Sequence, residues 1–311
     1  MTVNGSAWPC DLSAGAEREP LPTGRFEARG AAAPSACPDD DVAVADLNAL
    51  HGFTCPPATA NCRLTDRIDL LFQWIAAAGC TDGVTLQDIW ITSEPMIAAR
   101  LGSVCPFTYH EVFIQTNFLD DAIILSRHPV LSSEVQHFYK NFRHVLHARI
   151  DHPLGPLDVF TTHLASGSDG AQNPCAGDCP PECVAGGAAT VRECQGLQFG
   201  RYIAAHHDVS APAIATGDFN VSPGTFVYNQ LADRGWIDEY FAAGNPECVP
   251  ATGVGCTSGR VDNDLSQMES PASNETERID YVFVVPAANG ACGVDTPACR
   301  RRRHRHPHLR R

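Results

Sequence analysis

Short apolar runs, each about the length of one β-strand, constrain the fold of this chain more than any other feature. They lie at 42–48, 83–89, 122–125, 145–150, 157–162, 213–217 and 279–285. Helices are expected between some of them, at 64–78, 95–101, 190–207 and 225–234. Because the strands alternate with helices but also follow one another directly, the pattern predicts an α/β layered sandwich rather than a doubly wound sheet.

Composition divides the chain into three parts. Residues 1–40 are rich in Gly, Ala, Pro and Glu and are expected to form a loosely ordered leader, whereas 41–299 form the folded domain. Residues 300–311 hold seven Arg and no acid, which indicates either a basic arm or an altered terminus. No run reaches the roughly 20 apolar residues of a membrane helix, so we expect no transmembrane segment. We also expect the protein to be a monomer.

The formal net charge is −14, although the last twelve residues are strongly basic. A folded domain this acidic is not suited to tight, charge-driven binding of nucleic acid. A nuclease that uses a divalent cation to offset the repulsion stays possible.

The chain has 14 cysteines, a high number for a reducing compartment. Close pairs occur at Cys55 and Cys62, Cys248 and Cys256, and Cys292 and Cys299, and a group of four follows at Cys175, Cys179, Cys183 and Cys194. We expect most of them to form disulfides, with a zinc site in the group of four as the alternative. An extracellular or periplasmic location follows, although the first ten residues contain no recognisable signal peptide.

Polar side chains stand where several of the apolar runs end. Asp218 and Asn220 follow the run at 213–217, and His163 follows the run at 157–162. An acid and an amide two residues apart project to the same side of a strand, where they can hold a water molecule and a metal. Each signal is weak alone, because capped turns, structural histidines and rim salt bridges such as Arg278 with Asp280 give the same pattern.

Taken together, these elements resemble the endonuclease/exonuclease/phosphatase superfamily, which has the deoxyribonuclease-I-like fold. The resemblance rests on six short segments in the family's order: Ala45-Asp46-Leu47-Asn48 with His51-Gly52, Val84-Thr85-Leu86-Gln87-Asp88, Ala122–Pro129, Thr162-His163-Leu164, Gly217-Asp218-Phe219-Asn220 and Arg278–Phe283. The cysteine-rich loops and Thr162–Ser166 are most similar to the secreted, sphingomyelinase-like phosphodiesterases of this superfamily.

The resemblance implies a four-layer α/β/β/α sandwich and hydrolysis of a phosphate ester with Mg²⁺ or Mn²⁺. Asn48 and Asp88 would serve the metal, and His163 would bind a phosphoryl oxygen. Asp218 would orient and deprotonate the attacking water with help from Asn220. Asp280 would position a catalytic histidine further along the chain.

Two departures from the family pattern bear on activity. Asp88 stands where the family has Glu, so its oxygens fall short by about 1.5 Å, the length of one C–C bond. Mg²⁺ demands near-ideal geometry, so we expect the shorter ligand to bind it through water, weakly, or not at all. No Asp-His dipeptide follows the 279–285 run, which implies that the last core strand of the fold and its histidine are missing.

The sequence therefore predicts a metal-dependent phosphodiesterase whose substrate is a phospholipid head group or a small phosphodiester. A deoxyribonuclease-like endonuclease acting on nucleic acid is the first alternative. A family member that keeps the fold but has lost catalysis, through Asp88 and the absent Asp-His pair, is the second.

Overall fold

The computed structural model describes residues 42–50, 60–114, 121–140, 142–167, 170–175, 177–258 and 276–287. The predictions for residues 1–40 and 300–311, for the Cys55–Cys62 pair and for the Cys292–Cys299 pair concern residues outside these ranges. The same holds for the last core strand after 287. Among the described residues, every helix is too short or too polar to cross a bilayer.

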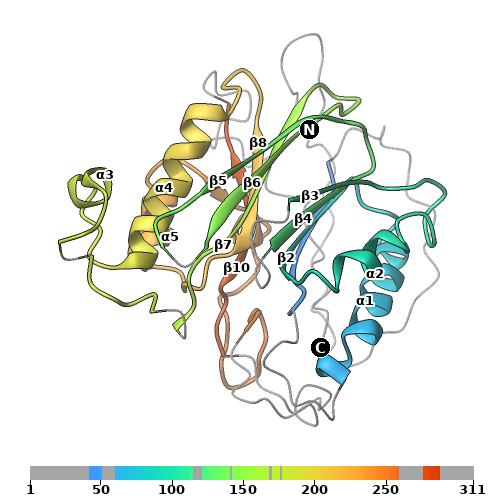
Figure 1. The fold of residues 1–311 in the computed structure, drawn as a ribbon, viewed down its shortest axis with the longest axis horizontal. Coiled ribbons are helices and arrows are strands. Elements are labelled where there is room, and N and C mark those ends of the chain that lie inside the picture. Colours follow the sequence, from blue (N-terminus) through green and yellow to red (C-terminus); the bar gives the residue numbers. More distant parts are fainter. Residues whose placement is uncertain are drawn as a thin grey trace.

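Two β-sheets face each other and helices cover their outer faces (Figure 1). The four-stranded sheet has the order β1-β2-β4-β3, with β1 Val44–Asn48, β2 Gly83–Ile89, β4 Asp121–Ser126 and β3 His110–Ile114. The six-stranded sheet has the order β5-β6-β7-β8-β10-β9, with β5 Val130–His137, β6 His144–Ile150, β7 Leu157–His163, β8 Ala213–Asp218, β10 Asp280–Val285 and β9 Ile237–Asp238. This arrangement confirms the predicted α/β/β/α sandwich.

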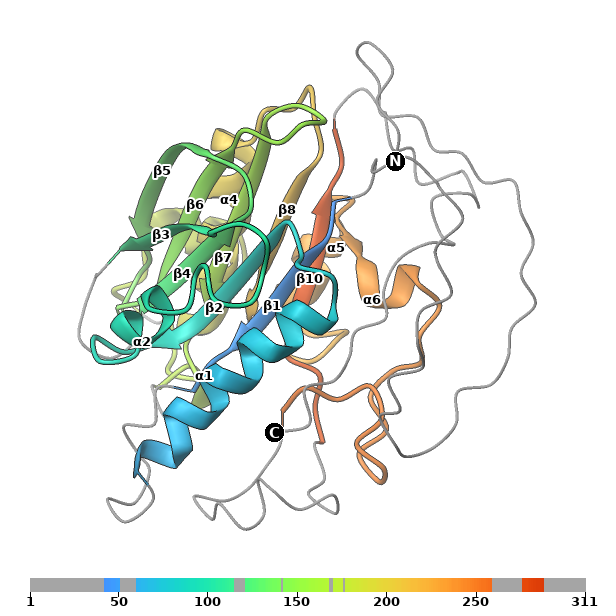
Figure 2. The same ribbon diagram turned by 90° about the vertical axis from the view of Figure 1, so that its right-hand side faces the viewer.

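Helices cover the outer face of each sheet, so the four layers follow the order helix, sheet, sheet, helix. Helix α1 (Ala60–Ala77) lies along the four-stranded sheet (Figure 2), and α2 (Glu94–Ala98) packs beside it. Helices α4 (Val191–His206) and α5 (Phe226–Ala232) cover the six-stranded sheet. Two shorter helices, α3 (Pro181–Ala185) and α6 (Glu239–Ala242), lie in the connecting segments.

Apolar side chains fill the space between layers because each strand points alternate residues to its two faces. On β4, Ile124 faces the other sheet, whereas Ile123 and Leu125 pack under α1. On β8, Ile214 lies between the sheets, and Ala213 and Ala215 face α4. Strands buried on both faces explain why these runs read as continuously apolar in the sequence.

Three strands lie outside the predicted elements, namely β3, β5 and β9. The residues of β5 are mostly exposed, since this strand forms the outer edge of its sheet. An edge strand with both faces largely in water lacks the apolar pattern on which a sequence prediction depends.

Four disulfides are present among the described cysteines. Cys248 bonds Cys256, and the group of four forms the pairs Cys175–Cys179 and Cys183–Cys194. These bonds leave no free thiolate in the group for the zinc alternative. The fourth disulfide, Cys80–Cys105, joins residues 25 positions apart, a spacing that gave no signal in the sequence.

The Cys80–Cys105 disulfide should stabilise the domain more than Cys248–Cys256, because it closes 25 residues rather than 8. Replacing Cys80 and Cys105 by Ala should lower the free energy of unfolding by about 3 kcal/mol. Replacing Cys248 and Cys256 by Ala should also lower the free energy of unfolding, but the loss should be about 1 kcal/mol smaller. Urea unfolding at equilibrium measures both. Free thiols at Cys80 and Cys105 in the native wild-type protein would contradict the pairing.

Candidate functional site

The polar residues at the strand ends gather at one end of the sandwich, where the two sheets meet. Residues 163 and 218 are paired neighbours on the parallel strands β7 and β8, and Asp280 lies opposite Asp218 on β10. Asn48 ends β1 of the other sheet, and its side-chain amide donates to Asp218 Oδ2 at 3.0 Å. The residues predicted from sequence thus come from strands of both sheets and from the loop after β8. They are Asn48, Asp88, His163, Asp218, Asn220 and Asp280.

His163 lies between two carboxylates. Its Nδ1 is 3.3 Å from Asp88 Oδ1, and its Nε2 is 3.7 Å from Asp218 Oδ2. The histidine and Asp218 are buried, and the Asp88 side chain is 13% exposed.

Asp88 reaches this cluster because β2 contains a β-bulge. The register between β2 and β4 shifts between Leu86 and Ile89, and Asp88 has a left-handed φ of +57°. A bulge adds one residue to a strand and redirects a side chain, and bulges are common beside active sites. Aspartate tolerates the left-handed region better than most residues do.

Asp218 is held by hydrogen bonds to both of its oxygens. Oδ1 accepts the backbone N–H of Asn220 at 2.8 Å, and Oδ2 accepts from Asn48. Asn220 also has a left-handed φ, +54°, and its side-chain amide donates to the Leu164 carbonyl at 2.9 Å. Asn220 thus connects the loop after β8 to the loop after β7, and its amide faces a backbone oxygen.

Gly217 allows β7 and β8 to approach closely beside the site. Its φ is +142°, and a Cβ atom at this position would lie 2.0 Å from the Thr162 carbonyl oxygen. No side chain can be accommodated there without moving one of the two strands.

A buried ion pair fixes the start of β10. The Arg278 guanidinium is 2.8 Å from Asp238 Oδ2 and lies over the rings of Tyr240, Phe241 and Tyr281, with distances of 4.3–5.0 Å to the ring centroids. Only 2% of Arg278 is exposed. Arg278 thus pairs with Asp238, whereas the sequence suggested Asp280 as its partner, and this contact anchors the chain two residues before Asp280.

Behind the strand ends, a row of polar groups crosses between the sheets. Gln87 Nε2 donates to Asp46 Oδ1 at 2.6 Å and to Thr161 Oγ1 at 2.8 Å, and Thr216 Oγ1 donates to Thr85 Oγ1 at 2.9 Å. Sequence reasoning missed this network, because its partners belong to different sheets.

Asp46 is the titratable member of this network. Burial raises the pKa of its carboxyl group to about 7, the negative charge of Asp218 acts in the same direction, and hydrogen bonds from Thr85 and Gln87 oppose the shift. Its Oδ2 atom is buried and accepts no hydrogen bond.

A second group of possible metal ligands lies near the opposite end of β2 and consists of Asp82, His128 and His152. Two of the atoms that could bind a metal already accept hydrogen bonds from the backbone. The Ala43 N–H donates to Asp82 Oδ2 at 2.9 Å, and the Leu154 N–H donates to His152 Nδ1 at 3.2 Å. A histidine that accepts a hydrogen bond at Nδ1 carries its proton on Nε2, which opposes metal binding there. This group is therefore less suited to a cation than the strand-end cluster.

The aromatic residues Phe107, Tyr109 and Phe113 pack in the apolar cluster between α1 and the four-stranded sheet, Tyr109 fully and the other two partly buried.

Comparison with known proteins identifies the family to which the chain belongs. The model of the Endonuclease/Exonuclease/phosphatase family matches residues 47–299, which cover most of the chain. The chain belongs to this family. Its members are typically phosphoester hydrolases and generally use divalent metal ions. A search of curated protein sequences finds no significant match.

Solved structures share the fold at low sequence identity. An endonuclease/exonuclease/phosphatase from Bacteroides vulgatus is 19% identical and has a TM-score of 0.55, over 78% of this chain and 86% of that one. D. rerio TDP2 complexed with a single-strand DNA product is 17% identical, with a TM-score of 0.53, over 80% and 85%. A mannosyl-6-phosphatase from Bacteroides thetaiotaomicron is 16% identical, with a TM-score of 0.52, over 79% and 85%.

Replacing Asp46 by Asn should remove a pH-dependent loss of stability. A carboxyl whose pKa rises from 3.8 to about 7 on folding favours the native state below pH 4, and this contribution is lost as pH rises toward 7. At pH 8 the variant should be more stable than wild type by up to about 4 kcal/mol, and at pH 4 the difference should vanish.

Urea unfolding across this pH range, with EDTA present, measures the difference. A stability gap between wild type and variant that stays constant with pH would contradict the assignment.

Proposed function

We propose that this protein is a divalent-metal-dependent phosphodiesterase. The observation that carries the proposal is the convergence of Asn48, Asp88, His163 and Asp218 from both sheets at one end of the sandwich. Family membership supports phosphoester hydrolysis in general.

The donor set suits a hard cation. Asn48 and the carboxylates of Asp88 and Asp218 offer oxygen atoms, which Mg²⁺ and Mn²⁺ prefer. We propose that Asn48 and Asp88 hold the ion. When bound, it would offset the negative charge of the acids and of the phosphodiester and stabilise the charge that develops on the phosphoryl oxygens.

The remaining residues act on the water and the phosphate. Asp218 would accept a proton from the attacking water, since Asn48 and Asn220 hold its carboxylate in a fixed orientation. His163 would donate a hydrogen bond to a phosphoryl oxygen from its place between the two acids. In this arrangement Asn220 would hold Asp218 rather than bind substrate, and Asp280 lies opposite Asp218 on the neighbouring strand.

Two substrate classes remain alternatives. The structure of D. rerio TDP2 with a DNA product makes nucleic acid a reasonable test substrate. The net charge of −14 speaks against tight binding of a polyanion, which favours a small phosphodiester or a phospholipid head group.

Hydrolysis of bis(p-nitrophenyl) phosphate should require Mg²⁺ or Mn²⁺ and stop with EDTA. Asp218→Asn should lower kcat by about 10²- to 10⁴-fold, because a positioned general base is lost. Asp233→Asn, a change at an exposed acid after α5, is the matched control and should retain full activity.

p-Nitrophenyl phosphate and a single-stranded DNA oligonucleotide, assayed in parallel, separate diesterase, monoesterase and nuclease activity. A folded wild-type protein that hydrolyses none of the three would support the non-catalytic alternative.

Lengthening Asp88 to Glu should strengthen metal binding. The added methylene extends the carboxylate by about 1.5 Å and restores the residue typical of the family. The Mg²⁺ concentration for half-maximal activity should fall about tenfold. The metal-induced rise in Tm should increase in the same variant, which provides a readout without substrate. A variant that binds Mg²⁺ no better than wild type would show that Asp88 does not hold the ion.

A further inference from the structure

Helix α4 begins beside the two loops that follow the proposed catalytic residues His163 and Asp218. The Arg192 guanidinium donates from Nε to the Ala165 carbonyl oxygen at 2.6 Å and from Nη1 to the Asn220 carbonyl oxygen. Ala165 is two residues after His163, and Asn220 is two residues after Asp218. One side chain therefore joins the loop after β7 to the loop after β8.

Gln195, one turn further along α4, supports the same loop. Its Oε1 accepts the Ala165 N–H at 2.9 Å, so both backbone polar groups of Ala165 are held by α4. Its Nε2 donates to the carbonyl oxygens of Tyr139 and Lys140, in the connection between β5 and β6. Gln195 has no exposed surface, and it links this connection to the site.

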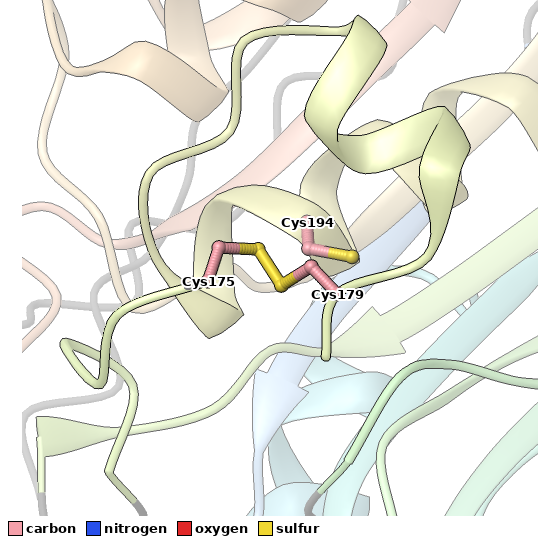
Figure 3. A group of neighbouring side chains, drawn as sticks. All are labelled: Cys175, Cys179 and Cys194. Carbon is pink, nitrogen blue, oxygen red and sulfur yellow. A yellow bond between two sulfur atoms is a disulfide. The ribbon is translucent and has the colours of Figure 1, made fainter. Parts of the chain in front are cut away.

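The start of α4 is a rigid support for these contacts. Thr190 and Glu193 form a capping box, which fixes the first helical turn. Cys194 lies between Arg192 and Gln195 in sequence, and its disulfide to Cys183 ties α4 to α3. Figure 3 shows the Cys194 side chain next to the Cys175–Cys179 disulfide, and these cysteines pack in one small cluster at the start of α4.

The loop after β8 needs such a support. Asn220 in this loop has a positive φ of +54°, a conformation that is strained for a residue with a side chain. The Asn220 N–H orients Asp218, so a shift of this loop moves the carboxylate. Arg192 holds the carbonyl of the same residue.

We propose that Arg192, supported by Gln195, is a positioning residue that sets the distance between His163 and Asp218. The inference rests on the proposed phosphodiesterase function of this site. Arg192 contacts backbone oxygens of the two loops, and it acts on the reaction through the geometry of His163 and Asp218, which directly precede these loops. A planar guanidinium suits this task because its donors diverge at fixed angles, which a lysine ammonium cannot reproduce.

The test compares Arg192→Ala and Arg192→Lys with Arg201→Ala, which removes an exposed arginine of the same helix. In the bis(p-nitrophenyl) phosphate assay, Arg192→Ala should lower kcat about 100-fold with little change in KM, because misplacement of catalytic groups acts on the transition state. Arg192→Lys should lie between Arg192→Ala and wild type. Millimolar guanidinium chloride, with NaCl as the matched salt, should partly restore Arg192→Ala and leave Arg201→Ala unchanged.

Hydrogen exchange provides a readout that needs no substrate. In Arg192→Ala, the amides of Leu164, Ala165 and Asn220 should exchange about tenfold faster or more, whereas those inside β6 and β7 stay protected. If the wild-type protein hydrolyses no phosphodiester, the proposed function fails. Faster loop exchange would then still show that Arg192 holds the loops.

Three results would overturn the inference. The first is an Arg192→Ala variant whose kcat and loop exchange rates both equal those of the wild-type protein. The second is full activity in Arg192→Lys, which would show that positive charge alone suffices. The third is loss of protection throughout the six-stranded sheet in both variants, which would make Arg192 a residue of the fold rather than of the site.

Discussion

The candidate site depends on contacts that cross from one sheet to the other. Asn48 and Asp88 belong to the four-stranded sheet, and His163 and Asp218 belong to the six-stranded sheet. The sheets are held face to face by an apolar layer, and polar bonds such as those of Gln87 with Thr161 and of Thr216 with Thr85 cross between them behind the site. Any change in how the sheets pack would separate the proposed metal ligands from the proposed base, although each sheet remained intact.

Burial of several acids in one place is unfavourable, and the structure offsets it by two means. Hydrogen bonds from Asn48 and Asn220 orient Asp218, and His163 lies between the carboxylates of Asp88 and Asp218. The carboxyl group of Asp46 is buried close to Asp218, and burial is the main cause of its raised pKa. Burying these acids together lowers the stability of the domain, as in other sites where polar residues are buried for function. In the proposed function, a bound divalent cation would offset their negative charge.

Sequence reasoning located the fold and the strand ends because buried strands leave continuous apolar runs, and Asp218 and His163 follow two of them. It could not show that Asn48 reaches Asp218, since sheet packing joins residues 170 positions apart. Strand β5 was missed because exposed edge residues carry no apolar pattern. Arg192 and Gln195 were missed for another reason: their partners are backbone carbonyl and amide groups, which every residue has, so no side-chain pattern marks the contact.

The close approach at Gly217 has a consequence for how this site can vary. The space beside the Thr162 carbonyl admits a hydrogen atom but not a methyl group, and the two strands that meet there carry His163 and Asp218 as their next residues. In a saturation library, position 217 should therefore accept glycine alone, whereas the flanking acid and amide positions would retain folded but inactive substitutes. A single achiral residue, which takes no part in the chemistry, thus sets the tightest limit on divergence of the site.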